Sequence, residues 1–397
     1  MPRPKHILIL TTDAGSGHRS AARALSDAFE RLYGDAAQVT VVNPIHHPRA
    51  SSLLRLYEQV YLDEMQHVPA LYHLTYALTD ITGVNHMLAG SVHQLLHTAI
   101  RNVLREHPAD VVISVFPIFT AIVASILRHE ETRPGLMSVV TDLGSVHSTW
   151  FSRHDDYCAV PTPLARRKAI RCGLDPRRVV TTGIPVRPEF AEPRADAATL
   201  RRELGWREDV PTLLLLGGGA GVGQLAALAE ALDAARLPLE LAIVTGTNAA
   251  LADQLRARSW HSTVHIYGFV PLADLMHAAD IVATKAGGLT VSEALAAGKP
   301  LLIHGVPPGQ EEGNLRFVRD AGAGLWAPDA TSLVRHVRRW LEQPAELAQV
   351  TAAARRAGQP DAALRIARLG WELAASAPRL NPPTFLSRAK RQLNAWV

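Results

Sequence analysis

The sequence is poor in cysteine. Only Cys158 and Cys172 occur among its 397 residues, and they form neither a C-x-x-C pair nor a framework of paired cysteines. This scarcity argues against a disulfide-stapled scaffold and is typical of a protein from a reducing compartment, so we expect a cytoplasmic protein.

Long apolar runs are also missing. One strongly apolar, uncharged run, residues 111–127, is slightly short for a membrane span and is interrupted by Pro117. A buried strand, a turn and a helix explain this run better. Residues 1–6 lead directly into an apolar strand, unlike a signal peptide. We therefore expect a protein that is soluble or bound peripherally to a membrane.

Neither sign of charge dominates. The formal net charge is +4 and the isoelectric point is near 9.2, with 20% charged and 47% hydrophobic residues. Such a composition is typical of a globular protein rather than a disordered one. The basic excess mildly favours an anionic surface or substrate, but it is too small to indicate binding of nucleic acid.

Two motifs of cofactor and metal chemistry are absent. Without G-x-G-x-x-G, the fingerprint of nicotinamide dinucleotide binding is not supported. There is no D-x-D motif, and the adjacent pair Asp155 and Asp156 is expected to be solvated. His93 and His97, four residues apart, are a weak metal-binding signal on their own. We therefore expect neither a metal nor a cofactor.

What the chain does contain is a repeated series of strand, turn and helix, which predicts a doubly wound α/β fold. The predicted strands are residues 7–10, 39–42, 110–115, 136–141, 157–161, 179–182, 211–216, 239–245, 265–267, 280–284 and 300–304. The Pro-rich residues 183–193 divide the series, so we expect domains at 1–192 and 193–377. A ligand is expected between them, beyond the carboxyl ends of the strands.

Residues 285–295 are the most informative stretch. They indicate a strand end, a glycine turn and a helix start, whose free N–H groups suit an anion. Glu293, about one turn into that helix, can accept hydrogen bonds from hydroxyl groups. A phosphate beside a polyol is a sugar nucleotide. Three further segments fit the same ligand, namely the glycine loop 217–223, the strand end 267–270, and residues 307–314.

Three other features each allow two interpretations. The strand end 142–151 brings Asp142, His147 and Trp150 together as a site, unless Asp142 caps a turn and Trp150 packs in the core. Residues 50–105 form either core-packed helices or an aromatic insertion that touches lipid. The basic amphipathic tail 378–397 packs on the first domain, which is the favoured interpretation, or lies on anionic lipid.

Taken together, the motifs resemble those of the monogalactosyldiacylglycerol synthase and bacterial diacylglycerol glucosyltransferase group. This group is a branch of the MurG-like glycosyltransferases of family GT28, which have the GT-B fold of two Rossmann-like domains. The matching segments, in the family's order, are residues 15–19, 140–151, 183–190, 217–221, 267–270, 285–295 and 308–314.

The resemblance implies an inverting transfer of a hexose from UDP-glucose or UDP-galactose to the hydroxyl of diacylglycerol, at the inner face of the cell membrane. His18 would be the general base, and a neutral imidazole is available because its ordinary pKa is ~6.5. Asp142 or His147 would orient His18 or contact the acceptor. The implied substrate-binding residues are Gly17, His147, Gly218, Gly219, Gly221, Phe269, Val270, Gly288, Leu289, Thr290, Glu293, Gln310, Glu311 and Asn314.

Within that list, Phe269 and its neighbours would hold the uracil, and the glycine loop and the 288–290 turn would hold the diphosphate. Glu293 would bind the ribose, and Gln310 and Glu311 the donor sugar. The turn at 287–290 is closer to the bacterial glucosyltransferase form than to the plant galactosyltransferase form, so the donor sugar stays open.

Other functions fit parts of the same pattern. A UDP-N-acetylglucosamine 2-epimerase also uses two such domains but needs no acceptor and no lipid-facing surface. A MurG-like transferase could use a different lipid acceptor. In a non-enzymatic sugar-nucleotide binding protein, His18 and the segment around Asp142 would be superfluous.

Overall fold

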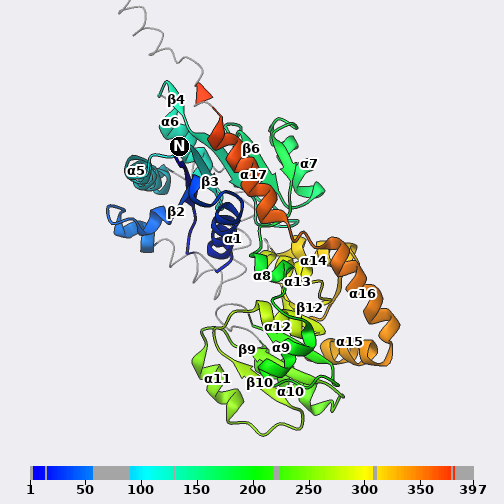
Figure 1. Ribbon diagram of the computed structural model, residues 1–397. Helices are drawn as coiled ribbons and strands as arrows, with labels where there is room; N and C mark the ends of the chain where they lie inside the picture. The colour runs from blue at the N-terminus through cyan, green and yellow to red at the C-terminus, as the bar shows by residue number, and fades with distance from the viewer. Residues whose placement is uncertain are drawn as a thin grey trace, which may run out of the picture.

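The computed structural model describes residues 3–13, 16–56, 90–128, 130–217, 224–306, 311–376 and 379–380. Every strand predicted from the apolar runs is present, with each end within two residues of the expected one. Figure 1 shows the two α/β units into which these strands assemble.

The first unit is built on a parallel six-stranded sheet in the order β2-β1-β3-β5-β6-β7. Its strands are β1 (Lys5–Leu10), β2 (Ala37–Val42), β3 (Val111–Ser114), β5 (Gly135–Val139), β6 (Tyr157–Val160) and β7 (Val179–Thr181). The central strands are buried on both faces, which is why they appear in the sequence as continuous apolar runs.

The second unit repeats this plan with a parallel sheet in the order β10-β9-β8-β11-β12-β13. Its strands are β8 (Thr212–Leu216), β9 (Glu240–Val244), β10 (Val264–Tyr267), β11 (Ile281–Lys285), β12 (Leu301–Gly305) and β13 (Gly324–Trp326). In each sheet the strand order reverses beside the first strand, and such reversals are where doubly wound sheets bind ligands.

Helices cover both faces of each sheet. Those of the first unit are α1 (Ser16–Tyr33), α5 (Gly90–Glu106), α6 (Phe119–Leu127) and α7 (Pro163–Arg171). Those that follow are α8 (Pro188–Ala191), α9 (Ala197–Leu204), α10 (Leu225–Ala234), α11 (Ala249–Arg256), α12 (Ala273–Ala278), α13 (Gly288–Ala296), α14 (Glu312–Asp320), α15 (Ala330–Glu342), α16 (Pro344–Ala357) and α17 (Ala362–Ala375). Residues 111–127 form β3 and α6, as expected of that uncharged run.

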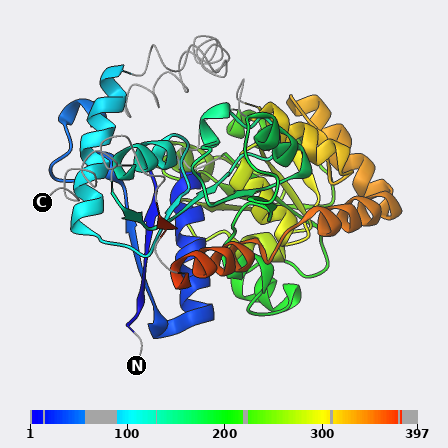
Figure 2. The ribbon, with the colours of Figure 1, turned by 90° about the horizontal axis from the view of Figure 1, so that it is seen from above.

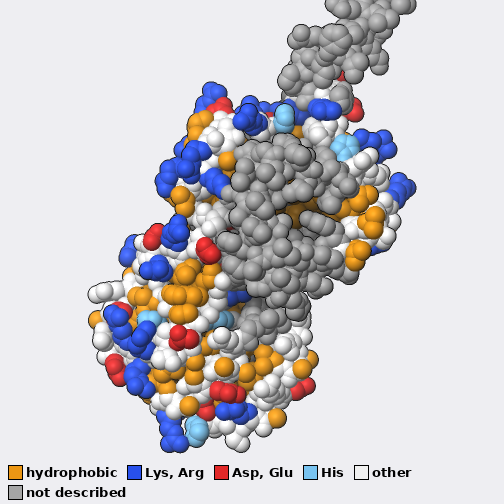
Figure 3. Space-filling model, turned by 180° about the vertical axis from the view of Figure 1, so that it is seen from behind, with side chains coloured by type: hydrophobic (Ala, Val, Ile, Leu, Met, Phe, Trp, Pro, Cys, Tyr) orange, Lys and Arg blue, Asp and Glu red, His pale blue; other side chains and the backbone are white. Residues whose placement is uncertain are grey.

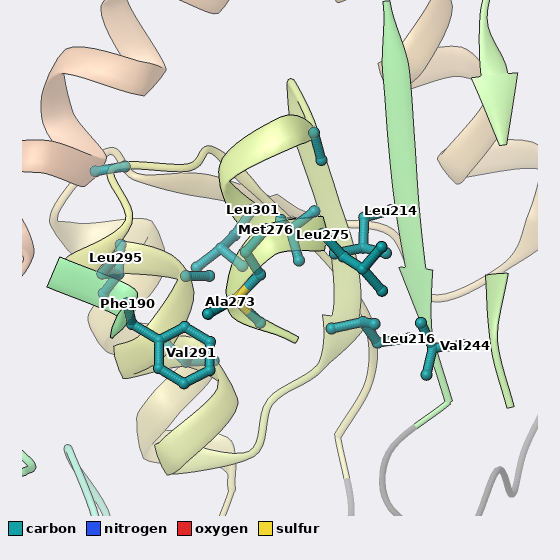
Figure 4. Close-up of a cluster of buried hydrophobic side chains, with 14 of the residues drawn as sticks. Phe190, Leu214, Leu216, Val244, Ala273, Leu275, Met276, Val291, Leu295 and Leu301 are labelled. Carbon is teal, nitrogen blue, oxygen red and sulfur yellow. The ribbon is translucent and has the colours of Figure 1, made fainter. Parts of the chain in front are cut away.

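Helix α13, which contains most of the stretch 285–295, is held rigidly in the second core. Its residues 291–295 are all buried. Figure 4 shows Val291 and Leu295 of α13 in one cluster with Phe190 of α8 and with Met276 and Leu301. Burial of an aliphatic side chain stabilises by about 1.5–3 kcal/mol, so this packing fixes where the helix begins.

The last helix returns to the first unit. In Figures 1 and 2, α17 lies alongside α1. Gly370 lets α17 approach closely, because a Cβ there would lie 2.8 Å from Phe29 and 3.0 Å from Ile113. The chain therefore rejoins the first core well before the expected boundary at residue 377. Beyond it, β14 (Arg379–Leu380) pairs antiparallel with β4 (Thr132–Arg133) of the first unit, while the rest of the predicted tail lies outside the described residues.

The two units meet backbone to backbone. A Cβ on Gly144 would lie 2.4 Å from the carbonyl oxygen of Gly313, and the Leu143 amide donates a 2.9 Å hydrogen bond to Asn314 Oδ1. Leu143, from the first unit, is buried within the second core. The segment after β5 is thus locked against the start of α14.

Candidate active site

The two strand-order reversals bring together the residues predicted to carry the chemistry. In the first sheet, β1 leads into α1 with His18, and the neighbouring strand β3 ends next to Val115. In the second sheet, β8 ends beside β11, which leads into α13. The two helix starts approach each other, since a Cβ on Gly17 would lie 3.8 Å from Leu289 Cβ.

His18 is held by the end of β3. Its Nδ1 lies 2.8 Å from the carbonyl oxygen of Val115 and 3.5 Å from Thr141 Oγ1. Because a carbonyl oxygen can only accept, Nδ1 carries the proton and donates it. The other ring nitrogen, Nε2, therefore keeps its lone pair and is the basic atom of this side chain.

Aromatic rings surround the imidazole of His18. The ring of Phe116 meets it edge-on at a centroid distance of 5.2 Å, and Trp150 lies at 6.2 Å. Burial lowers the pKa of His18 to about 4, opposed in part by the hydrogen bond to Val115. The imidazole is consequently neutral throughout the physiological pH range.

The segment after β5 supports this arrangement from the side. Asp142 is buried, and its Oδ2 accepts a 2.8 Å hydrogen bond from Trp150 Nε1. Asp142 therefore positions the indole beside His18, and Trp150 packs in the core, as one of the two interpretations predicted, while the role of this strand end as a site stays a prediction. His147 is buried and caps the short helix Ser148–Trp150, with Nδ1 accepting from the Thr149 amide at 3.2 Å.

In the second unit, the start of α13 abuts the same segment. A Cβ on Gly288 would lie 2.6 Å from the carbonyl oxygen of Thr141, so only glycine fits there. Leu289 and Thr290 follow, half-buried in the first turn. The first intrahelical acceptor is Gly287, which bonds the Val291 amide, so the amides of residues 288–290 have no acceptor within the helix and suit an anion.

Glu293 lies deeper than its motif suggests. Its side chain is 4% exposed, and its carboxyl bonds Ser20 of α1. Burial raises the pKa of Glu293 to about 8, with Arg187 opposing and Glu189 adding to the shift. The carboxyl faces α1 here rather than an open surface, and its contact with ribose stays a prediction.

Asn314 corrects one expectation outright. Its side chain is fully buried, with Nδ2 donating to the Ala286 carbonyl at 2.8 Å and Oδ1 accepting from the Leu143 amide at 2.9 Å. Both ends of the amide are occupied by backbone partners, so Asn314 joins the two units and is not placed to bind sugar hydroxyls.

Lys285 and Glu311 form an ion pair beside the start of α13. Lys285 Nζ lies 2.7 Å from Glu311 Oε1, and the second oxygen, Oε2, is buried without a hydrogen-bond partner among the described residues. Phe269 follows β10 and is 75% exposed, while Val270 packs against the second core. An exposed aromatic ring on a rigid strand end suits stacking with a planar base.

Comparison with known proteins accords with this geometry. A family model described as monogalactosyldiacylglycerol (MGDG) synthase matches residues 18–186, and one described as glycosyltransferase family 28 C-terminal domain matches residues 212–366. Probable monogalactosyldiacylglycerol synthase 2, chloroplastic, of Oryza sativa subsp. japonica is 33% identical over 92% of this chain and 80% of that relative. The chain belongs to the monogalactosyldiacylglycerol synthase family. It is a glycosyltransferase.

Other comparisons agree. Monogalactosyldiacylglycerol synthase 1, chloroplastic, of Arabidopsis thaliana is 32% identical over 92% of this chain and 70% of that relative. MurG of Acinetobacter baumannii superposes with a TM-score of 0.63 at 18% identity, covering 93% of this chain and 100% of that structure. A putative UDP-N-acetylglucosamine 2-epimerase of Listeria monocytogenes gives 0.61 at 16% identity, covering 92% and 95%. These structures show the fold, which is GT-B.

Several of the residues that the family resemblance singled out lie outside the described part of the structure. They are Gly218, Gly219, Gly221 and Gln310, together with residues 57–89 of the predicted helical insertion and residues 381–397 of the tail.

Within the described residues, no three His, Cys, Asp or Glu side chains come together as a metal site. Contrary to expectation, Asp156 is buried and pairs with Arg133 at 2.7 Å, and Asp155 is buried too.

Three contributors to the site of this family member were missed from sequence. Val115 acts through its carbonyl oxygen, and a main-chain atom leaves no sequence signal. Phe116 follows a predicted strand, and its place at the carboxyl end of β3 could have identified it. Lys285 is the first residue of the stretch 285–295. Its positive charge next to a predicted phosphate-binding turn could have identified it as a candidate phosphate contact.

Proposed function

We propose that this protein transfers a hexose from a UDP-sugar to the free hydroxyl of diacylglycerol and produces a monoglycosyldiacylglycerol. The observation that carries the proposal is the placement of His18. Its Nδ1 donates to the Val115 carbonyl, and the start of α1 lies against the start of α13. This arrangement supports a reaction in which His18 is the base and the start of α13 holds the leaving group.

The proposed reaction is a single displacement with inversion. The acceptor oxygen bonds to the anomeric carbon while the bond from that carbon to the UDP oxygen breaks, and the hydroxyl proton passes to His18 Nε2. A base of pKa about 4 is weak toward a resting alcohol. The attacking oxygen, however, becomes strongly acidic as its new bond forms, so a weak but correctly placed base suffices.

The departing UDP carries the developing negative charge. The amides at residues 288–290, which have no acceptor within the helix, and the positive end of the α13 dipole stabilise that charge without a metal ion. Phe269 would stack on the uracil, and Glu311 would bind the donor sugar. The donor is UDP-glucose or UDP-galactose, and the family's plant members are named for the galactolipid.

The acceptor is a lipid, so the enzyme must reach a membrane. No helix in the described part of the chain is long and apolar enough to span a bilayer. In the view of Figure 3, Lys and Arg side chains are distributed over both units among apolar and acidic ones rather than gathered in one patch. We propose peripheral attachment to an anionic membrane surface, at the inner face of the cell membrane, and the support for it is the net charge of +4 rather than a basic patch in that view.

Lipid product analysis tests the proposed reaction. Purified protein incubated with diacylglycerol and either UDP-glucose or UDP-galactose should form a β-linked monoglycosyldiacylglycerol, at an undiminished rate in EDTA. UDP-N-acetylglucosamine serves as the control donor. Its epimerisation with no lipid product would refute the proposal. Loss of turnover in EDTA that added divalent cation restores would refute the metal-free mechanism alone.

The pKa of His18 predicts that activity persists to an unusually low pH. His18 is protonated only as pH falls toward about 4, whereas an ordinary histidine is protonated below 6.5. Because the neutral form is the base, kcat/KM for the acceptor should stay nearly constant down to about pH 5 and fall below it. A profile of kcat/KM against pH, with stability checked at each pH, measures this. A fall in kcat/KM centred near pH 6.5 would contradict the burial of His18 described above.

A further inference from the structure

The ion pair between Lys285 and Glu311 stands where donor recognition and leaving-group stabilisation meet. Lys285 is the last residue of β11, and the pairing of β11 with β12 shifts register between Thr284 and Lys285. Such a bulge changes the direction of the side chain that follows it and is common next to active sites. The register shift thus falls at the residue that forms the ion pair with Glu311.

The pair lies directly against the start of α13. A Cβ on Gly287, the residue that precedes this helix, would lie 3.8 Å from both Lys285 Nζ and Glu311 Oε1. The ammonium is thus beside the amides of residues 288–290, where the diphosphate is proposed to bind. Nζ has three N–H donors, and its side chain is 38% exposed, so donors remain for a ligand.

The ion pair occupies only one of the two carboxylate oxygens of Glu311. One oxygen accepts from Lys285, and the other is buried with no partner in the described part of the chain. Glu311 precedes α14 but does not cap it with its side chain. A buried carboxylate oxygen without a hydrogen-bond donor is unfavourable, and a hydroxyl group of a ligand would supply that donor.

The neighbouring histidine adds no charge here. His304, on β12, has Nε2 3.0 Å from the Leu216 carbonyl at the end of β8, and it donates to that oxygen. Burial lowers the pKa of His304, and the Lys285 ammonium lowers it further. His304 is therefore neutral, and Lys285 supplies the positive charge at this strand end.

We propose that Lys285 has two functions within the donor site proposed above. One N–H orients the Glu311 carboxylate so that its second oxygen meets a hydroxyl of the donor sugar, and the others contact the diphosphate. Because Glu311 binds the sugar, the ammonium lies nearer the β-phosphate than the α-phosphate. Lys285 is then a contact of the leaving group and a positioning residue for sugar recognition.

Calorimetric binding of UDP and UMP to the full chain separates these functions from a purely structural one. Lys285→Met should weaken UDP binding about 10- to 100-fold, the range for hydrogen bonds to charged groups, and UMP binding much less. Lys285→Arg, which keeps the charge, should bind UDP within a few-fold of wild type. Glu311→Gln should bind UDP no more weakly than wild type but should lose hexosyl transfer, because the carboxylate is needed only for the sugar.

Three outcomes would overturn this inference. They are wild-type UDP affinity in Lys285→Met, equal weakening of UDP and UMP, or equal loss of UDP affinity in both single variants with recovery in the double variant Lys285→Met/Glu311→Gln. The last pattern would mean that the ion pair only stabilises the local structure and does not contact the ligand. Thermal unfolding of each variant checks that the fold persists. If wild type itself binds no UDP, the proposed function fails, which is a distinguishable result.

Discussion

Replacing His18 by alanine is expected to lower hexosyl transfer by about 10²- to 10⁴-fold, the usual contribution of a positioned general base. The variant should still bind UDP, because the amides of residues 288–290, Phe269 and Lys285 are untouched. His18 is half-buried and its close polar partner is the Val115 carbonyl, so its loss should leave a folded protein. Initial rates with diacylglycerol, and UDP titration, measure the two effects.

An exposed histidine of the same unit provides the matched control. His154 lies on the surface of the turn between β5 and β6, so His154→Ala should retain normal turnover and stability. His18→Gln adds a second test, because an amide can still donate to Val115 but cannot accept a proton usefully. Near-normal turnover in either His18 variant would remove this residue as the base.

Substituting alanine for Gly313 is expected to abolish most activity by separating the two units. A Cβ on Gly313 would lie 2.0 Å from the Ser145 amide nitrogen and 2.5 Å from the Gly144 carbonyl carbon. Both obstacles are backbone, so the start of α14 must move, and Asn314 and Glu311 must move with it. Overpacking of this kind costs about 1–3 kcal/mol, and a displacement of about 1 Å at a reacting centre can cost about 10²-fold in rate.

Gly34→Ala is the matched control for the cost of losing a glycine. Gly34 has φ +49 with open space at its Cβ position, so alanine there meets no neighbour and is strained only through its backbone conformation, by about 1–2 kcal/mol. Thermal unfolding and initial rates of both variants give the comparison. Equal, small effects from Gly313→Ala and Gly34→Ala would show that the contact between the two units does not hold the site together.

The amino-acid sequence was sufficient to predict the strands and the order of the loops that follow them. Strands buried on both faces are continuous apolar runs, and parallel order places their carboxyl ends at one edge of the sheet. The loops around 285–295 could therefore be assigned to that edge from their order along the chain. His18 was identifiable because it follows a short strand within a motif shared with the family.

The remainder depends on contacts between distant residues. Asn314 follows a turn just as a sugar ligand would, and only its burial between Ala286 and Leu143 shows that it joins the units. Glu293 has the spacing of a hydroxyl-binding residue, yet α1 covers it. The return of α17 could not be predicted either, because an amphipathic helix does not specify which sheet it covers.

That return has a consequence for biosynthesis. A ribosome releases the first sheet long before residues 362–375 are made, and until then the apolar surface around Phe29, Ile113 and Met137 lacks its final cover. Part of the core of the first unit therefore stays uncovered while the whole second unit is translated. The first unit begins the chain, yet its core is completed only when α17 has been made.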